Sequence, residues 1–304
     1  MKIVSLLPSA TEIVFALGLG DQLEGVTYEC DFPVDAKTKP IVSDTALPQD
    51  RPLTPGEIDR LVREFMERKE PIYVLDKELI QTIQPDLILA QDLCRVCAVP
   101  SGQVEQALDE LGCRSEVLSL DPHSLYDVIE GIDQVGRAAG ATDAAVELTS
   151  NLRDRVERVG KTAAGLPSIR TLALEWSDPP WVGGHWIPEM VQIAGGVNLL
   201  NEPRQPSRTI TWTDLREAAP EVVVFMPCGM YLPEAVEEVA SLLRNQDVAE
   251  TPAARAGDVF AVDASAYFSR PGPRLVDGLE ILAWAIHPEA FPPPSSDTIA
   301  RVGG

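Results

Sequence analysis

The sequence is poor in basic residues and contains no long apolar run. Its 25 lysines and arginines are outnumbered by 47 aspartates and glutamates, which gives a net charge of −22. This charge argues against nucleic acids and anionic membrane surfaces as partners, because both attract basic proteins. No stretch reaches the ~20 apolar residues that a membrane-spanning helix requires. We therefore expect neither nucleic-acid binding nor membrane insertion.

Several motifs of enzymes are also missing. Gly18 and Gly20 have the spacing of a phosphate-binding turn, but they follow a predicted helix instead of a strand. No serine nucleophile elbow and no pair of catalytic carboxylates stands out. The five cysteines are an odd number, so they cannot form a complete disulfide framework. The sequence therefore predicts a binding protein and not an enzyme.

The first residues predict the location of the protein. Met1 and Lys2 lead directly into the strand-like residues 3–7, with no cleavage site for a signal peptide. We therefore expect a cytoplasmic protein, or a periplasmic or extracellular one if an export signal has been removed.

Strand-like and helical segments alternate along the first half of the chain. Residues 3–7, 23–27, 71–75, 85–90 and 115–120 predict strands, and residues 10–17, 77–84, 103–111 and 125–139 predict helices. Ser9 and Glu12 have the spacing of a capping box, which predicts Ser9 as the N-cap of the first helix. This alternation is typical of an α/β fold with a parallel sheet.

The second half repeats this plan. Residues 212–225 read as a short helix, a proline, an acid and four apolar residues, as do residues 77–90. Between the halves, residues 141–165 carry an apolar stripe at helical spacing, formed by Ala145, Leu148, Leu152, Val156 and Val159. We predict an N-terminal lobe over 1–140, a connecting helix over 141–165 and a C-terminal lobe over 166–304. A single wound domain is the alternative.

The loops that follow the predicted strands hold the candidate site residues, because ligands of open α/β sheets bind beyond the carboxyl ends of the strands. If the two lobes face each other, these loops line a cleft. The ligand-binding candidates are Ser9, Tyr28, Cys30, Trp176, Trp181, His185, Trp186, Tyr267, Phe268 and Arg270.

Three tryptophans lie within residues 176–186, in a segment rich in proline and glycine that reads as a long loop. Exposed indoles there would suit a large, flat, apolar ligand. The alternative is that the loop packs onto its own lobe. His185 could bind a metal through a neutral ring nitrogen, or form a structural hydrogen bond. His123 and His287 stand at the ends of predicted elements, where a capping role is sufficient.

Cys94 and Cys97 have the spacing of a redox dithiol or of half a zinc site. The remaining metal ligands would come from Cys30, Cys228 or His185. The alternative is that Cys94 and Cys97 are unconnected small residues in a tight loop. Cys113 precedes a strand and is expected to be buried elsewhere.

Four segments of the sequence resemble one known family. Residues 3–12, 30–33, 84–90 and 195–198 look like class III substrate-binding proteins of ABC importers, most of all the vitamin B12-binding branch and a subgroup of it without signal peptides. The resemblance implies two Rossmann-like lobes with parallel sheets, joined by one long α-helix. It also implies a corrinoid or another metal chelate held between aromatic side chains. Family members dock on a permease through one glutamate per lobe. Glu78 matches the first, and Thr213, with Asp214 beside it, occupies the second position.

Two hypotheses follow. The first is a binding protein for cobalamin, a related corrinoid or another small-molecule metal chelate, with an ABC permease as a possible partner. The second is a cytoplasmic thiol protein that carries a transition metal or a cluster, or acts as a redox enzyme, through Cys30, Cys94, Cys97 and Cys228.

Overall fold

The computed structural model describes residues 1–92, 99–111 and 113–302. The chain forms two compact units. Unit 1 comprises Met1–Pro122 and Asp127–Asn151, and unit 2 comprises His123–Tyr126 and Leu152–Gly304. Each unit is described by itself. The predicted domain boundaries at residues 140 and 165 stay predictions.

Unit 1 contains a six-stranded sheet among the described residues, with the strand order β4-β3-β2-β1-β5-β6. The antiparallel pair is β3 with β4, and the other neighbours are parallel. The strands are β1 (Ile3–Ser5), β2 (Leu23–Thr27), β3 (Ile41–Thr45), β4 (Tyr73–Leu75), β5 (Leu87–Ala90) and β6 (Glu116–Ser119). The helices are α1 (Pro8–Ala16), α2 (Pro55–Arg68), α3 (Lys77–Ile83), α4 (Ser101–Leu111) and α5 (Leu125–Ala138). Every residue of β1 and β5 is buried, as expected for central strands covered on both faces.

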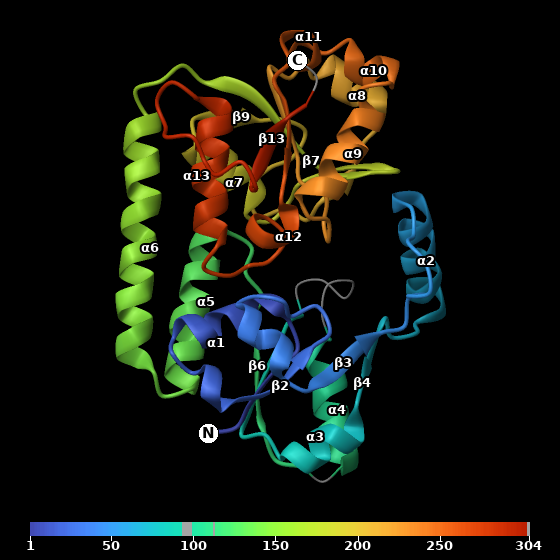
Figure 1. Cartoon of the computed structure of the whole chain (residues 1–304), viewed down its shortest axis with the longest axis vertical. Coiled ribbons are helices and arrows are strands. Elements are labelled where there is room, and N and C mark those ends of the chain that lie inside the picture. The colour runs from blue at the N-terminus through green and yellow to red at the C-terminus, as the bar shows by residue number, and fades with distance from the viewer. Residues whose placement is uncertain (93–98, 112, 303–304) are drawn as a thin grey trace. The chain divides into compact units, whose positions relative to one another are not determined.

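Unit 2 contains a sheet in which β10-β8-β7-β11-β12-β13 follow one another and β9 pairs with β7. The strands are β7 (Ile169–Ser177), β8 (Pro180–Val182), β9 (Gly196–Asn198), β10 (Arg208–Thr209), β11 (Val222–Phe225), β12 (Val259–Val262) and β13 (Ile299–Arg301). The helices are α7 (Ile187–Ile193), α8 (Trp212–Glu217), α9 (Leu232–Leu242), α10 (Gln246–Ala249), α11 (Pro252–Ala256), α12 (Ala264–Tyr267) and α13 (Leu275–Ile286). The β7–β11–β12 core is parallel. The predicted α/β fold with mostly parallel sheets is confirmed (Figure 1).

The repeated plan of the two halves is present in the structure. Helix α3 precedes β5 and helix α8 precedes β11, and all four residues of each strand are buried. Both helices begin at a side-chain cap. Asp76 accepts a hydrogen bond from the backbone N–H of Leu79, and Thr211 forms a capping box with Asp214. Each cap pairs one of the backbone N–H groups that the first turn of a helix leaves without partners.

Helix α6 (Thr142–Ala163) is the predicted long helix. Its apolar stripe is buried at Ala145, Leu152 and Val156. In unit 1 the hydroxyl of Thr149, on the first half of α6, donates to a carboxylate oxygen of Asp133 on α5, at 2.9 Å. In unit 2 the second half contacts α13, where the Arg155 side chain binds Glu280 and Asp277.

Two local predictions are wrong. Ser9 is not the N-cap of α1: the helix begins at Pro8, whose fixed φ suits the first helical position. The segment read as a long loop from residue 175 to 186 is a β-hairpin, because β7 runs on to Ser177 and turns at Asp178 into β8. The segment after residue 291 contributes β13, which pairs antiparallel with β12.

In the described part of the chain, no helix combines the length and the apolar character that a membrane crossing requires.

Candidate functional site

The β7–β8 hairpin carries two tryptophans opposite each other. Trp176 and Trp181 are cross-strand partners in an antiparallel pair, and both are half-buried. Directly opposed residues in such a pair point to the same face of the sheet. The hairpin extends beyond the last register pair of β7 with β11, Leu174 and Phe225. Unit 2 therefore presents two neighbouring indoles beyond the carboxyl end of its central strands.

Trp186 and Phe268, also expected to be exposed, lie inside unit 2 instead. Their relative exposures are 6% and 2%. The indole Nε1–H of Trp186 donates a hydrogen bond to the backbone oxygen of Phe268 at 2.9 Å. These two residues stabilise the segments that carry the other candidates, and we do not count them as ligand contacts.

Tyr267 and Arg270 lie near the C-terminal end of α12. Tyr267 is half-buried, and the guanidinium of Arg274 lies 5.7 Å from the centre of its ring. Burial raises the pKa of the Tyr267 hydroxyl, which therefore stays protonated at neutral pH. Arg270 is half-buried on the following turn. The two residues place an aromatic face and a cation at the carboxyl end of β12.

His185 follows β8 in a backbone conformation fixed on both sides. Its φ is +52°, its N–H donates to the oxygen of Gln205 at 2.6 Å, and its oxygen accepts from the N–H of Arg204 at 3.0 Å. Its Nδ1 atom is buried without a hydrogen-bond partner in the described residues. Burial, with a smaller contribution from His123, lowers the pKa of His185, so its ring is neutral at pH 7. A neutral imidazole can donate a lone pair to a metal ion.

The His123 ring lies against the His185 ring, a contact that was not predicted from the sequence. The centroids of the His123 and His185 rings are 5.7 Å apart with an interplanar angle of 49°. His123 is exposed and precedes α5, where only a capping role was expected. The signal that could have identified it is its place after β6, since loops at the carboxyl ends of strands carry ligand contacts.

Glu175 places a carboxyl group beside this segment. Its carboxylate accepts hydrogen bonds from the hydroxyl of Ser207 and the N–H of Gly184. Burial raises the pKa of Glu175 despite these bonds. A Cβ atom on Gly184 would lie 2.2 Å from the nitrogen of Ser207, so the two backbone segments are in close contact.

In unit 1 the predicted contacts are less accessible. Ser9 and Cys30 have exposures of 2% and 5%, and the Cys30 Sγ lies 3.1 Å from the hydroxyl oxygen of Thr11. Tyr28 is half-buried, its hydroxyl donates to Glu29, and burial raises its pKa. Of these three residues, Tyr28 is the one with a partly accessible side chain.

The predicted cysteine cluster is only partly described. Cys94 and Cys97 lie outside the described residues, so their predicted grouping with Cys30 stays a prediction. Cys228 is half-buried after β11, and its N–H donates to the oxygen of Glu175 at 3.3 Å. Within the described ranges, no group of three or more histidine, cysteine, aspartate or glutamate side chains could hold a metal ion.

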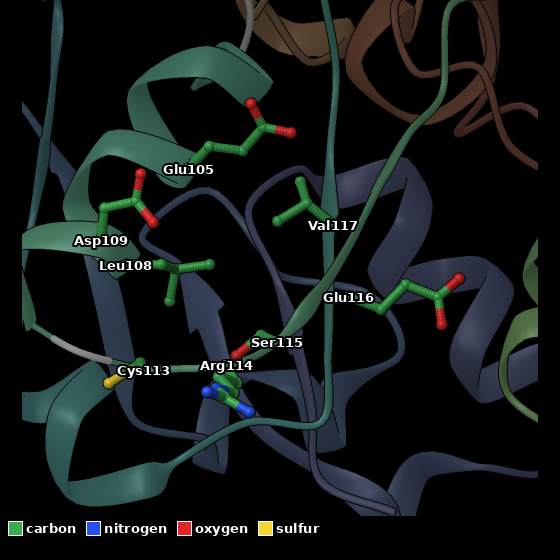
Figure 2. Close-up of a pocket in the computed structure, with 8 residues that line it drawn as sticks. All are labelled: Glu105, Leu108, Asp109, Cys113, Arg114, Ser115, Glu116 and Val117. Atoms are coloured by element: carbon green, nitrogen blue, oxygen red, sulfur yellow. The ribbon is translucent and has the colours of Figure 1, made fainter.

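Cys113 is buried, as predicted, and it lines a cavity of about 450 Å³ in unit 1. Figure 2 shows Glu105 and Asp109 on α4 facing this cavity, with Val117 of β6 on the opposite side. The residues from Cys113 to Ser115 precede β6 and line the cavity at the amino end of that strand. Because ligands of such sheets bind at the carboxyl ends, we do not assign this cavity to the ligand site.

The predicted docking residues lie in equivalent first turns. Glu78 is exposed in the first turn of α3. Asp214 is exposed in the first turn of α8, but its carboxylate accepts hydrogen bonds from both the N–H and the hydroxyl of Thr211, each at 2.8 Å. The cap therefore holds the Asp214 carboxylate in a fixed orientation.

The sequence model of the family described as "Periplasmic binding protein" matches residues 3–266. The chain belongs to this family. It is 25% identical over 95% of its length to an ABC transporter substrate-binding lipoprotein of Bacillus subtilis, and the match covers 81% of that protein. It is 24% identical over 92% of its length to a vitamin B12-binding protein of Vibrio vulnificus, of which 87% is covered.

Solved structures share the fold. A periplasmic heme-binding protein from Pseudomonas aeruginosa aligns with a TM-score of 0.75 and 24% identity, covering 100% of this chain and 98% of that one. The periplasmic vitamin B12-binding protein of Vibrio cholerae aligns with a TM-score of 0.69 and 22% identity, covering 94% and 96%. The predicted family resemblance and the prediction of a binding protein, not an enzyme, are confirmed.

The predicted cytoplasmic location is wrong. The matching family is one of periplasmic binding proteins, and the Bacillus subtilis relative is a lipoprotein. The prediction depended on the residues at which the sequence begins, and that position carries no information about an export signal. The cytoplasmic and redox-enzyme parts of the second hypothesis fall with it, whereas metal binding by the cysteines stays a prediction.

Proposed function

We propose that the chain is the extracytoplasmic receptor of an ABC importer and that its ligand is cobalamin or a related corrinoid. The observation that carries the proposal is the Trp176–Trp181 pair on the β7–β8 hairpin. Two half-buried indoles on one face offer a flat apolar surface, which suits a large planar macrocycle. Relatives named as vitamin B12-binding proteins, 24% identical over 92% of the chain, support a corrinoid.

Haem and ferric chelates present the same kind of flat or compact metal complex, and the haem-binding protein from Pseudomonas aeruginosa has the same fold. The test must therefore compare ligands. We expect the melting temperature of the purified chain to rise with cobalamin concentration and to rise less with equal concentrations of hemin or a ferric siderophore, because a ligand that binds only the folded state stabilises it by mass action. A larger rise with hemin would reassign the ligand while leaving the receptor function in place.

The hairpin tryptophans can be tested separately. Trp176→Ala and Trp181→Ala should each weaken cobalamin binding about tenfold, because each removes an aromatic contact area worth roughly 1–2 kcal/mol. Trp212→Phe is the matched control, since Trp212 is a half-buried tryptophan of α8 that packs on the unit 2 core. Equal losses in all three variants would count against a contact role for the hairpin.

Glu78 is our proposed contact to the permease, because it is an exposed carboxylate at the start of α3. We expect Glu78→Gln to leave ligand binding unchanged and to weaken association with a reconstituted permease. Asp214→Asn is the comparison in unit 2. Its capping role predicts a loss of stability, whereas a docking role predicts a loss of association at unchanged stability.

A further inference from the structure

Outside the hairpin, the imidazole rings of His123 and His185 lie close together in unit 2. Their ring centroids are 5.7 Å apart. Two imidazoles that share one tetrahedral ion at metal–nitrogen bonds of about 2.0–2.1 Å have ring centroids roughly 5 Å apart. The observed centroid spacing is within about 1 Å of that value.

The His185 ring supplies a second observation. Its Nδ1 atom is buried and has no hydrogen-bond partner in the described residues. Buried polar atoms of native proteins are nearly always paired, and those that are not call for a ligand, a water or an ion. The Nδ1 lone pair is thus available for coordination.

The backbone holds His185 in place for this role. The hydrogen bonds to Gln205 and from Arg204 fix the residue on both sides, and the neighbouring Gly184 N–H is bound by the Glu175 carboxylate. Ligands that are fixed in orientation by surrounding hydrogen bonds bind metals more tightly than mobile ones. The backbone of His185 is thus held in place, and His123 is an exposed residue beside it.

We propose that His123 and His185 together bind a divalent transition-metal ion such as Zn²⁺, Ni²⁺ or Cu²⁺. Imidazole nitrogen suits these ions. Within the residues that the structure describes, no third histidine, cysteine or carboxylate completes the set, so the remaining positions are filled by water or by a small external ligand. The proposal concerns the bare ion and does not depend on which chelate the receptor carries.

The chain offers a built-in control, because His287 is its third and last histidine. Long-range proton–nitrogen spectra of the tag-free, ¹⁵N-labelled full chain show three imidazoles. During a Zn²⁺ titration in the presence of a thiol reductant, we expect the signals of His123 and His185 to shift together and saturate while those of His287 stay in place. Signals that stay unchanged, or that shift for all three rings without saturation, would overturn the proposal.

Two variants test the assignment. His123→Ala alters an exposed side chain and should lower the Zn²⁺ affinity reported by the His185 signals at least tenfold. His185→Asn keeps a residue type that tolerates positive φ, and should remove the saturating shift of His123. Zinc bound by cysteine thiolates would leave both imidazole signals unmoved in the wild-type chain, and that result would also contradict the proposal.

Discussion

The indole Nε1–H of Trp186 donates a hydrogen bond of 2.9 Å to the backbone oxygen of Phe268, and both side chains are buried in unit 2. This bond connects the segment after β8 to the end of α12. The segment after β8 carries His185, and the end of α12 carries Tyr267. The hydrogen bond therefore fixes the segments that carry His185 and Tyr267. The side chains of Trp186 and Phe268 themselves are buried and do not face a ligand.

Trp186→Phe should lower the free energy of unfolding by about 2–3 kcal/mol, because it leaves the buried oxygen of Phe268 without its donor and removes part of a buried ring. Urea denaturation followed by circular dichroism measures this loss. Trp176→Phe is the control, since Trp176 is half-buried, and it should lose less stability. Equal losses in the two variants would contradict the structural role of Trp186.

Gly184→Ala should be strongly destabilising. A Cβ atom there would lie 2.2 Å from the nitrogen of Ser207 and 2.5 Å from the carbonyl carbon of Pro206. These are backbone atoms that cannot rotate away, so we expect the free energy of unfolding to fall by about 2–3 kcal/mol.

Gly102→Ala is the matched control for this prediction. Gly102 lies in α4 with no heavy atom within 4 Å of an added Cβ. Alanine is the better helix former, so this variant should be unchanged or more stable by up to about 1 kcal/mol. Thermal unfolding of both variants decides the comparison, and a harmless Gly184→Ala would show that the segments are not in close contact.

Glu175 should make stability depend on pH. Burial raises its pKa in the folded chain, so the folded chain keeps the proton to a higher pH than the unfolded chain does. The stability contributed by the protonated carboxyl is present below the unfolded pKa and is lost as the pH rises through the folded pKa.

Glu175→Gln does not ionise, and its amide oxygen can still accept from Ser207. It should therefore be more stable than the wild-type chain at about pH 8 and lose that advantage at about pH 4. Urea unfolding of both proteins at the two pH values measures this. A stability difference that is the same at both values would show that Glu175 does not titrate between them.

Local pattern predicted much of the fold. The bounds of β2 were predicted as residues 23–27, and the α3–Pro85–β5 unit recurs as α8–Pro220–β11 because each strand is a short apolar run behind a proline. The hairpin was missed because its prolines and glycines are typical of loops, whereas the pairing of Trp176 with Trp181 depends on register with a neighbouring strand. The start of α1 was predicted wrongly although the deciding feature is local. The fixed φ of Pro8 suits the first helical position, so the helix begins there and Ser9 is not its N-cap.

The candidate site was less predictable. The carboxyl-end rule selected His185 and the hairpin tryptophans, but it also selected Trp186 and Phe268, which are buried. Whether an aromatic residue in a loop faces solvent depends on tertiary packing, which local pattern does not contain. The contact of His123 with His185 joins segments far apart in the sequence, so only the folded chain shows it.

The central claim is that this receptor binds a corrinoid. Isothermal titration of the purified full chain with cyanocobalamin tests it most directly. We predict saturable binding of one cobalamin per chain at micromolar or lower concentration, weakened by Trp176→Ala and Trp181→Ala and unaffected by Trp212→Phe. Absence of binding at high micromolar cobalamin, with hemin or a ferric siderophore binding the same preparation, would contradict it.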